Sequence, residues 1–199
     1  MVIQKVDYKR EHKELYAATR MPAMVEVPEL SFLMIDGSGD PNTSTAFQEA
    51  VGALYSVSYG LKFASKNGPA GMDYVVMPLE GLWSDPTGDE GAWRWTLMIM
   101  QPGEITQEMV AQAVRDAAAR KPLPAAPQLR FERFAEGLAA QVLHMGPYDQ
   151  EEPTIDRLMT FIAEQGYEPA GRHHEIYLSD PSRAAPEKLK TIIRHAIAP

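Results

Sequence analysis

A glutamate stands in the middle of the stretch GRHHEIYLSDP, among residues typical of a β-strand. Side chains alternate between the two faces of a strand, so Glu175 shares one face with His173 and Tyr177. His174 and Ile176 share the other face. A carboxylate in apolar surroundings is costly unless a partner or a task compensates it. Glu175 could therefore pair with a cationic ligand or act as a general base toward water, or it could be an ordinary solvent-exposed glutamate.

A second glutamate lies close to all three tryptophans of the chain. Glu80 occurs in MPLEGLW, and Trp83, Trp93 and Trp95 follow within a short stretch. Tryptophans usually pack in a core. An exposed set would instead give a flat wall for planar ligands, with cation–π attraction for charged ones. Glu80 could approach the same ligand from the first half of the chain, or lie at the surface beside Pro78.

The segment AWRWTLMIMQP predicts a strand with two different faces. Alternation places Trp93 and Trp95 on one face and Met98 and Met100 on the other. Methionine side chains adapt to many ligand shapes, so the second face would also suit a binding site. The sequence leaves open which face meets a ligand.

Several tyrosines are further candidates for contact with a ligand. Tyr148 follows a strand in HMGPYD, where a turn could bring it over a ligand. Tyr55 and Tyr59 lie one helical turn apart, so packing of a helix on a sheet explains them equally well. Together with Tyr177, Tyr148 is a candidate for positioning a substrate or for donating a hydrogen bond to a developing oxyanion.

The histidines do not predict a metal site. His173 and His174 are neighbours on a strand and point to opposite faces, so they cannot chelate one ion together. The remaining three, His12, His144 and His195, are scattered. The chain has no cysteine, which excludes thiolate ligands and thiol nucleophiles. It also has neither a Walker phosphate loop nor a G-x-S-x-G esterase motif. We expect neither a metal nor a cofactor.

The composition is that of a folded, soluble protein. Of the 199 residues, 45% are hydrophobic and 23% are charged, which is sufficient for a sizeable core. The formal net charge of −8 repels phosphate backbones, so a nucleic-acid partner is not expected. The sequence has no apolar run long enough to cross a bilayer, and its charged beginning lacks a signal-peptide core. These features predict a cytoplasmic protein that binds neither membranes nor nucleic acids.

Both halves of the chain have the same predicted order of elements. In the first half, a strand in VEVPELSFLMIDGSGD precedes a helix over residues 43–63, and strands follow in DYVVMPLEGLW and AWRWTLMIMQP. In the second half, a strand around residues 138–145 precedes a helix that ends near Gly166, and strands follow in RHHEIYLSD and KLKTIIRHAI. We interpret this order as a duplication of one βαββ unit.

These repeats define the expected fold class and domain organisation. We predict a single α+β domain over residues 1–199, with a first βαββ repeat at 25–102 and a second at 128–199. A helix and the proline-rich linker KPLPAAP occupy residues 103–127. Two such modules can pair into an antiparallel-rich sheet with helices on one face, which leaves the other face for a ligand cleft.

Five segments together resemble the GyrI-like small-molecule-binding proteins. They are FLMIDGSGDPN, MPLEGLW, WRWTLMIMQP, HEIYLSDP and PEKLKTIIRHAI, and the resemblance extends over nearly the whole chain. It implies a pair of βαββ modules, an SHS2-type dyad, around a central ligand cleft. Members of this family include effector domains of multidrug-sensing transcription activators, a gyrase inhibitor and stand-alone proteins. The chain resembles the stand-alone kind, without DNA-binding helices.

The resemblance also gives the candidate residues a task. One stand-alone subfamily hydrolyses cyclopropane-bearing DNA-alkylating compounds in an aromatic cage, and the segment from MPLEGLW to WRWTLMIMQP resembles that subfamily most. The implied catalytic residues are Glu175, Tyr177 and Tyr148. The implied ligand-binding set is Glu80, Trp83, Trp95, Met98, Met100, Tyr55, Tyr59 and His173.

Three functions remain open at this point. The first is hydrolysis of cyclopropane-bearing xenobiotics by addition of water. The second is non-catalytic binding, which would sequester or sense flat, lipophilic and often cationic molecules. The third is a protein-interaction module, such as a gyrase-binding inhibitor. The first two share one site, so the sequence cannot separate them; in both, the partner is a small molecule.

Overall fold

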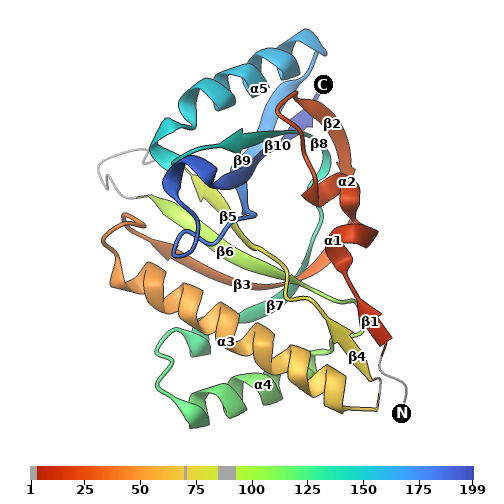
Figure 1. Ribbon diagram of the computed structural model, residues 1–199, viewed down its shortest axis with the longest axis vertical. Coiled ribbons are helices and arrows are strands. Elements are labelled where there is room, and N and C mark those ends of the chain that lie inside the picture. Colours follow the sequence, from red (N-terminus) through yellow and green to blue (C-terminus); the bar gives the residue numbers. More distant parts are fainter. Residues whose placement is uncertain (1–3, 70, 85–92) are drawn as a thin grey trace. The chain divides into compact units, whose positions relative to one another are not determined.

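The computed structural model describes residues 4–69, 71–84 and 93–199 of the chain (Figure 1). These residues form two compact units, and each unit combines strands with helices. The first unit comprises the described residues of Met1–Glu11, Leu30–Met77 and Ser84–Phe134. The second comprises His12–Glu29, Pro78–Trp83 and Ala135–Pro199. None of the helices in the described ranges combines the length and apolar character that a membrane span requires.

Antiparallel strands form the centre of the first unit. The strand β3 lies between β6 and β7 and pairs with both in antiparallel register. A short parallel pair, β1 with β4, accompanies them. The strands of this unit are β1 (Gln4–Val6), β3 (Leu30–Ser38), β4 (Met72–Tyr74), β6 (Arg94–Gln101) and β7 (Arg130–Phe134).

Helix α3 (Thr45–Asn67) is the longest element of the first unit. It begins where the Ser44 side chain accepts a hydrogen bond from the backbone N–H of Phe47, and it ends before Gly68 and Pro69. Its buried residues Ala50, Leu54, Val57 and Leu61 repeat at helical spacing. Helix α4 (Gln107–Arg120) packs beside it, and the four-residue α1 (Tyr8–Glu11) completes the helices of this unit (Figure 1).

The second unit contains five antiparallel strands in the order β2-β8-β10-β9-β5. The residues of β5 that lie in this unit pair with β9 from Glu80 to Trp83. Pro28 separates β2 from β3, which were predicted as one strand, because proline cannot donate to a strand ladder. The interruption at Pro78 is as predicted, since β5 begins at the next residue. The strands are β2 (Ala23–Val27), β5 (Leu79–Ser84), β8 (Gly137–Met145), β9 (Glu168–Tyr177) and β10 (Lys190–Ala198).

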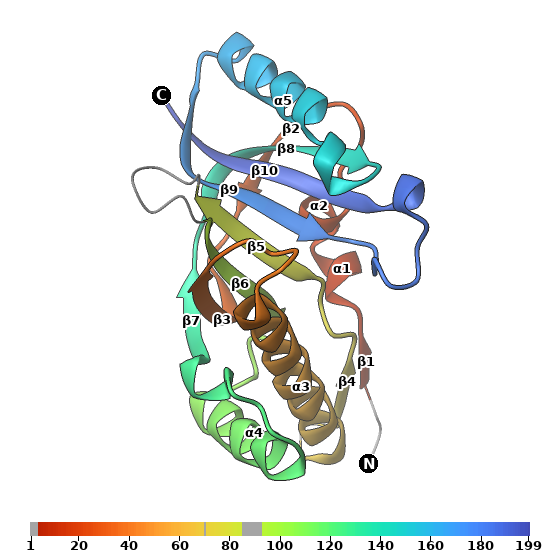
Figure 2. The same ribbon diagram turned by 90° about the vertical axis from the view of Figure 1, so that its left-hand side faces the viewer.

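Helix α5 (Glu152–Glu164) packs along β8 and β10 in the second unit (Figure 2). Its buried Leu158 and Ile162 contact Ala140, Val142 and Ile193 on these strands. The helix ends at Gly166, whose φ of +80° allows the backbone N–H of Tyr167 to reach the carbonyl of Ile162 at 3.1 Å. A second helix of this unit, α2 (Lys13–Tyr16), is only four residues long.

The predicted fold class is confirmed: the protein is α+β, and antiparallel strands predominate. The element order is β3-α3-β4-β5-β6 in the first half and β8-α5-β9-β10 in the second. The compact units differ in composition from the predicted repeats, since residues 78–83 join the second unit although they belong to the first repeat in sequence. The physical reason is their antiparallel ladder with β9, in which Glu80 to Trp83 pair with Ile176 to His173.

Candidate active site

Strand β9 carries the central carboxylate. Glu175 lies opposite Ile193 of β10 on one side and opposite Gly81 of β5 on the other. Because paired residues of antiparallel strands project to the same face, Glu175 shares its face with residues of both neighbouring strands. His173 and Tyr177, two positions away on β9, point to this face as the alternation predicts, and both hydrogen bond to Glu175.

A chain of hydrogen bonds runs through Glu175. The indole N–H of Trp83 donates to Tyr177 Oη at 3.0 Å, and the Tyr177 hydroxyl donates to Glu175 Oε2 at 2.7 Å. The second carboxylate oxygen, Oε1, lies 2.9 Å from His173 Nε2. His173 Nδ1 lies 3.0 Å from His195 Nε2 on β10. Both oxygens of Glu175 are therefore hydrogen bonded, which fixes the side chain.

Tyr177 remains a hydrogen-bond donor over the whole physiological pH range. Desolvation, followed by the charge of the Glu175 carboxylate, raises the pKa of Tyr177 well above its usual value. Its hydroxyl oxygen already accepts from Trp83, so its proton points to Glu175. Tyr177 is thus a positioning residue for the carboxylate.

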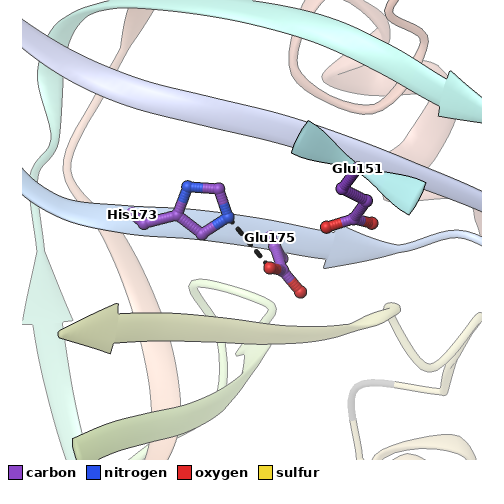
Figure 3. Close-up of side chains that lie close together, drawn as sticks. All are labelled: Glu151, His173 and Glu175. Atoms are coloured by element: carbon purple, nitrogen blue, oxygen red, sulfur yellow. Dashed lines mark hydrogen bonds and ion pairs between the residues drawn. The ribbon is translucent and has the colours of Figure 1, made fainter. Parts of the chain in front are cut away.

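A second carboxyl group, from Glu151, lies beside Glu175 (Figure 3). Ligand-type atoms of Glu151, His173 and Glu175 lie within 4.8 Å of one another. Glu151 immediately precedes α5, but its side chain does not cap the helix and is only 5% exposed. Its Oε1 atom makes no hydrogen bond to any described residue.

The environment of Glu151 favours the neutral acid. Desolvation is the main cause, and the neighbouring charge of Glu175 adds to it; together they raise the pKa of Glu151 to about 9. Two neighbouring carboxyl groups therefore differ in state at neutral pH: Glu151 holds a proton, whereas Glu175 accepts two hydrogen bonds. Such a difference is typical of acid and base pairs in catalytic sites.

Aromatic side chains surround Tyr177. Tyr148, which is 40% exposed, meets its ring edge-on with centroids 5.7 Å apart and an interplanar angle of 80°. Trp83 is buried. Gly81 leaves the space that these groups need, because a Cβ atom there would lie 2.7 Å from Trp83 Nε1 and 3.2 Å from Tyr177 Oη. Tyr148, Tyr177 and Trp83 therefore join Glu175 in one site.

The face on which this site lies needs a correction. The predicted ligand cleft lies on the face without helices, and Glu175 was expected on that face. Ile193, the partner of Glu175 across the ladder, packs against Leu158 of α5, so α5 and Glu175 lie on the same face of the second unit. Residue alternation defines two faces but not which of them a helix covers. The start of α5 supplies Glu151 to the site for this reason.

Glu80 lies on the opposite face, away from Glu175. It is 1% exposed, accepts a hydrogen bond from the Tyr16 hydroxyl at 2.8 Å and lies 3.0 Å from His174 Nε2. His174 Nδ1 lies 3.0 Å from Glu136, which also approaches Arg194 at 3.4 Å. The predicted role of Glu80 as a second ligand-binding carboxylate therefore has no geometric support in this unit.

The remaining predicted site residues belong to the first unit. Trp95, Met98 and Met100 are buried in its core, and the edge of Trp95 meets Phe47 with ring centroids 5.3 Å apart. Tyr55 and Tyr59 stack on each other along α3, and Tyr59 is 49% exposed. A role of these residues in ligand binding remains a prediction.

One group of side chains has the composition of a metal site. Among the residues that the structure describes, Glu151, His173 and Glu175 alone bring three suitable donor atoms together. The opposite orientation of His173 and His174 is as expected, but the sequence argument did not consider carboxylates from another element. The Nε2 atom that His173 would offer to a cation already bonds Glu175, so hydrogen bonding accounts for the cluster without an ion.

Sequence reasoning missed Glu151 and His195. Glu151 stands in YDQEEPT, where two acidic residues before a helix look like ordinary first-turn charges. His195 follows Arg194 on β10, and a register shift between Arg194 and Ala196 carries it out of the regular ladder with β9. An irregularity of this kind has no clear sequence signal. The only hint was Gly171, whose φ of +73° accommodates the shift.

The sequence pattern of the GyrI-like small molecule binding domain matches residues 20–196. The chain belongs to the GyrI-like family. No curated protein is a significant match to it. Family membership accounts for the order of strands and helices and identifies the chain as a small-molecule-binding domain.

Solved structures agree with this assignment. Two crystal structures of proteins from Listeria innocua cover 97% of this chain and 100% of their own. One, described as an uncharacterized conserved protein, is 38% identical with a TM-score of 0.90. The other, described as a hydrolase, is 39% identical with a TM-score of 0.87. The C-terminal domain of EcmrR, at 15% identity and a TM-score of 0.54, shares the fold alone; it covers 89% of this chain and 97% of its own.

Proposed function

We propose that this GyrI-like protein is a hydrolase that adds water to electrophilic, cyclopropane-bearing small molecules. The observation that carries the proposal is the pair of neighbouring carboxyl groups in different surroundings: Glu175 accepts two hydrogen bonds, whereas Glu151 is buried beside it with Oε1 unpartnered among the described residues. Glu175 is hydrogen bonded as a carboxylate, and the pKa of Glu151 is raised to about 9 by desolvation and by Glu175. The description of a 39% identical Listeria innocua protein as a hydrolase supports an enzyme over a binding protein.

The two carboxyl groups supply both proton transfers that such a reaction needs. As the water oxygen forms a bond to a ring carbon, Glu175 takes a proton from that water. The strained C–C bond breaks, and its electron pair moves into the conjugated carbonyl of the substrate. Glu151 donates its proton to the oxygen on which charge develops. The product is the substrate plus one water, and nothing is oxidised or reduced.

The aromatic residues hold the reactants. Tyr177 keeps Glu175 in place through its hydroxyl group, and Trp83 keeps Tyr177 in place. The half-exposed ring of Tyr148 offers a flat surface to a conjugated, planar substrate. A cationic substrate would gain attraction from Glu175, but the mechanism requires only an activated ring.

Mass spectrometry of a cyclopropane-fused cyclohexadienone incubated with the purified full chain tests the proposal. We expect a product heavier by one water, and incorporation of ¹⁸O when the reaction runs in labelled water. Glu175→Gln should lower the rate by about 10²–10⁴-fold, the usual contribution of a general base, while binding persists. The matched control is Glu168→Gln, an exposed glutamate on the same strand.

The alternatives give different results. Unchanged compound that elutes with the protein would mean sequestration without catalysis, and would refute the hydrolase. Turnover that Glu175→Gln leaves intact would remove Glu175 from the mechanism. Turnover that disappears on chelation and returns with a divalent cation would replace the proton-transfer pair by metal-assisted chemistry at Glu151, His173 and Glu175.

A further inference from the structure

One further polar side chain of the second unit lies on the same face as Glu175. Thr191 of β10 lies opposite Tyr177 of β9. Two positions further along β10, Ile193 lies opposite Glu175. Because paired residues of antiparallel strands project to the same face, Thr191 shares the face of Glu175 and Tyr177. Thr191 therefore lies on the face to which the start of α5 brings Glu151.

The Thr191 hydroxyl is a buried polar group without a partner. Thr191 is fully buried, and its Oγ1 atom makes no hydrogen bond to a described residue. Desolvation and the charge of Glu175 raise the pKa of Glu151, and the nearby Thr191 hydroxyl opposes them, although this contact falls short of hydrogen-bond geometry. Glu151 Oε1 is likewise buried and unpartnered among the described residues. Two such groups side by side are costly in the free protein, which indicates that they serve a bound molecule.

Both groups can donate a hydrogen bond to one acceptor oxygen. The Thr191 hydroxyl carries a hydrogen whatever the state of its neighbours. Glu151, as a neutral acid, carries another, which bonds Glu175 in the free protein. When the attacking water takes its place at Glu175, this hydrogen can turn to the substrate. Two donors that converge on one oxygen are well suited to stabilise negative charge that develops there.

We propose that Thr191 and Glu151 together bind the conjugated carbonyl oxygen of the substrate, with the Thr191 hydroxyl as a second donor to the oxygen that Glu151 protonates. The inference rests on the proposed hydrolase function, which identifies this oxygen as the one that receives the electron pair of the broken C–C bond. Glu151 transfers its proton to the oxygen, whereas Thr191 keeps its own and only donates a hydrogen bond. The site therefore selects cyclopropanes that are conjugated with a carbonyl group over cyclopropanes without one.

The variants Thr191→Val and Thr191→Ser test the hydroxyl itself. Valine keeps the branched shape of threonine but has no hydrogen to donate. With the cyclopropane-fused cyclohexadienone, we expect kcat to fall by about 10²-fold in Thr191→Val, the lower range for the loss of one oxyanion donor. KM should change by less than about threefold, because the hydrogen bond strengthens mainly in the transition state. Thr191→Ser keeps the hydroxyl, so its kcat should stay within about fivefold of the wild type.

Stability should not follow the rate. A buried hydroxyl without a partner opposes folding, so the urea midpoint of Thr191→Val should equal or exceed that of the wild type. The matched control is Thr160→Val, an exposed threonine of α5 whose hydroxyl donates to the Asp156 carbonyl at 2.9 Å, and it should leave kcat unchanged. If Thr191→Val lowers the urea midpoint together with kcat, Thr191 supports the fold or a structural water, and the carbonyl site is refuted. An unchanged kcat would also refute it.

A ligand that cannot react keeps this inference apart from the proposed function. The probe is a cyclohexadienone that carries two methyl groups in place of the fused ring and a ¹³C label at its carbonyl. Bound to the full chain in excess, its carbonyl stretching band in the infrared should move to lower wavenumber, and this shift should be smaller in Thr191→Val but kept in Thr191→Ser.

The two proposals can fail separately in this measurement. An unshifted band in the wild type, or an equal shift in Thr191→Val, would refute the carbonyl site even if the protein hydrates the fused dienone. Conversely, the expected shifts without any hydration product would keep Thr191 as a carbonyl-binding residue and refute the hydrolase.

Discussion

Two polar clusters lie on opposite faces of the same strand, and neighbouring residues of β9 build them. His174 belongs to a cluster with Glu80, Glu136 and Arg194, whereas Glu175 belongs to a cluster with Glu151 and two other histidines. The first, which we call the His174 cluster, combines two carboxylates with a guanidinium and an imidazole. The second, the Glu175 cluster, has two carboxyl groups and no permanent cation.

The difference in charge balance separates a structural cluster from a reactive one. In the His174 cluster, burial opposes the imidazolium, but Glu136 and Glu80 outweigh it and raise the pKa of His174 to about 9. Every member is paired, so the cluster has no proton to exchange at neutral pH. In the Glu175 cluster, desolvation and then the charge of Glu175 raise the pKa of Glu151 to about 9, so Glu151 holds a proton that is available for chemistry.

The largest effect on stability should come from removing the cation of the His174 cluster. Arg194 donates to Gln141 at 2.9 and 3.0 Å and to the backbone carbonyl of Leu15 at 2.6 Å, and it pairs with Glu136. Arg194→Met removes one of the two cationic partners of the buried Glu136 and leaves Gln141 and the Leu15 carbonyl without their donor, so we expect the free energy of unfolding to fall by about 3–5 kcal/mol. Urea denaturation at pH 7 measures this loss.

A matched substitution controls for the loss of charge itself. Arg183 is also in the second unit, but its side chain is 86% exposed, so Arg183→Met should change the free energy of unfolding by less than about 0.5 kcal/mol. Equal effects of the two substitutions would mean that the His174 cluster does not stabilise the fold. The distinction between a stabilising cluster on one face of β9 and a reactive cluster on the other would then be wrong.

The next effect concerns pH and the Glu175 cluster. The pKa of Glu151 rises from 4.5 to about 9 on folding, mainly through desolvation, so the folded chain holds a proton that the unfolded chain releases. Stability from this group is therefore present below pH 4.5 and is lost as the pH rises to about 9. In the wild type, the free energy of unfolding should decline by up to about 1.4 kcal/mol per pH unit over this range. In Glu151→Gln, this decline should be shallower.

The His174 cluster contributes to the same curve in a narrower window. The pKa of His174 rises from 6.5 to about 9, so its contribution is complete below pH 6.5 and declines above it. Between pH 5 and 6.5, the difference between Glu151→Gln and the wild type in how the free energy of unfolding changes with pH should therefore measure the contribution of Glu151. Glu152→Gln, at the exposed neighbouring position, serves as the control. A wild-type slope that Glu151→Gln leaves unchanged would contradict the protonated state of Glu151.

The sequence was informative where periodicity and local chemistry determine structure. Alternation on β9 correctly grouped His173, Glu175 and Tyr177, and helical spacing located α3. The pairing of β5 with β9 was not predictable, because the alternation of residues along a strand does not specify which strand lies beside it. That pairing puts Trp83 next to Tyr177 and Glu80 next to His174, and so divides two residues that the sequence placed in one site.

Long-range contacts account for the rest of what the sequence did not predict. Glu151 becomes an acid only because α5 packs on the face that carries Glu175, and no residue near Glu151 in the sequence indicates this. Its proton depends on desolvation and on a carboxylate from another element. The protonation state of a titratable group depends on its surroundings in space, which explains why Glu175 was predictable from the sequence whereas its partner Glu151 was not.

The smallest effect should come from Gly81, which lies between the two clusters on β5. Gly81→Ala places a methyl group 2.7 Å from Trp83 Nε1, so the indole must move and its hydrogen bond to Tyr177 weakens. We expect steady-state hydration to fall by about tenfold, because losing one hydrogen bond of about 1.4 kcal/mol loosens Glu175. Gly52→Ala, whose added Cβ would meet no atom within 4 Å beyond its chain neighbours and the backbone of its own helix, should leave the rate unchanged. A rate in Gly81→Ala equal to that of Gly52→Ala would show that the Glu175 cluster does not depend on Trp83, and the line of positioning contacts would then begin at Tyr177.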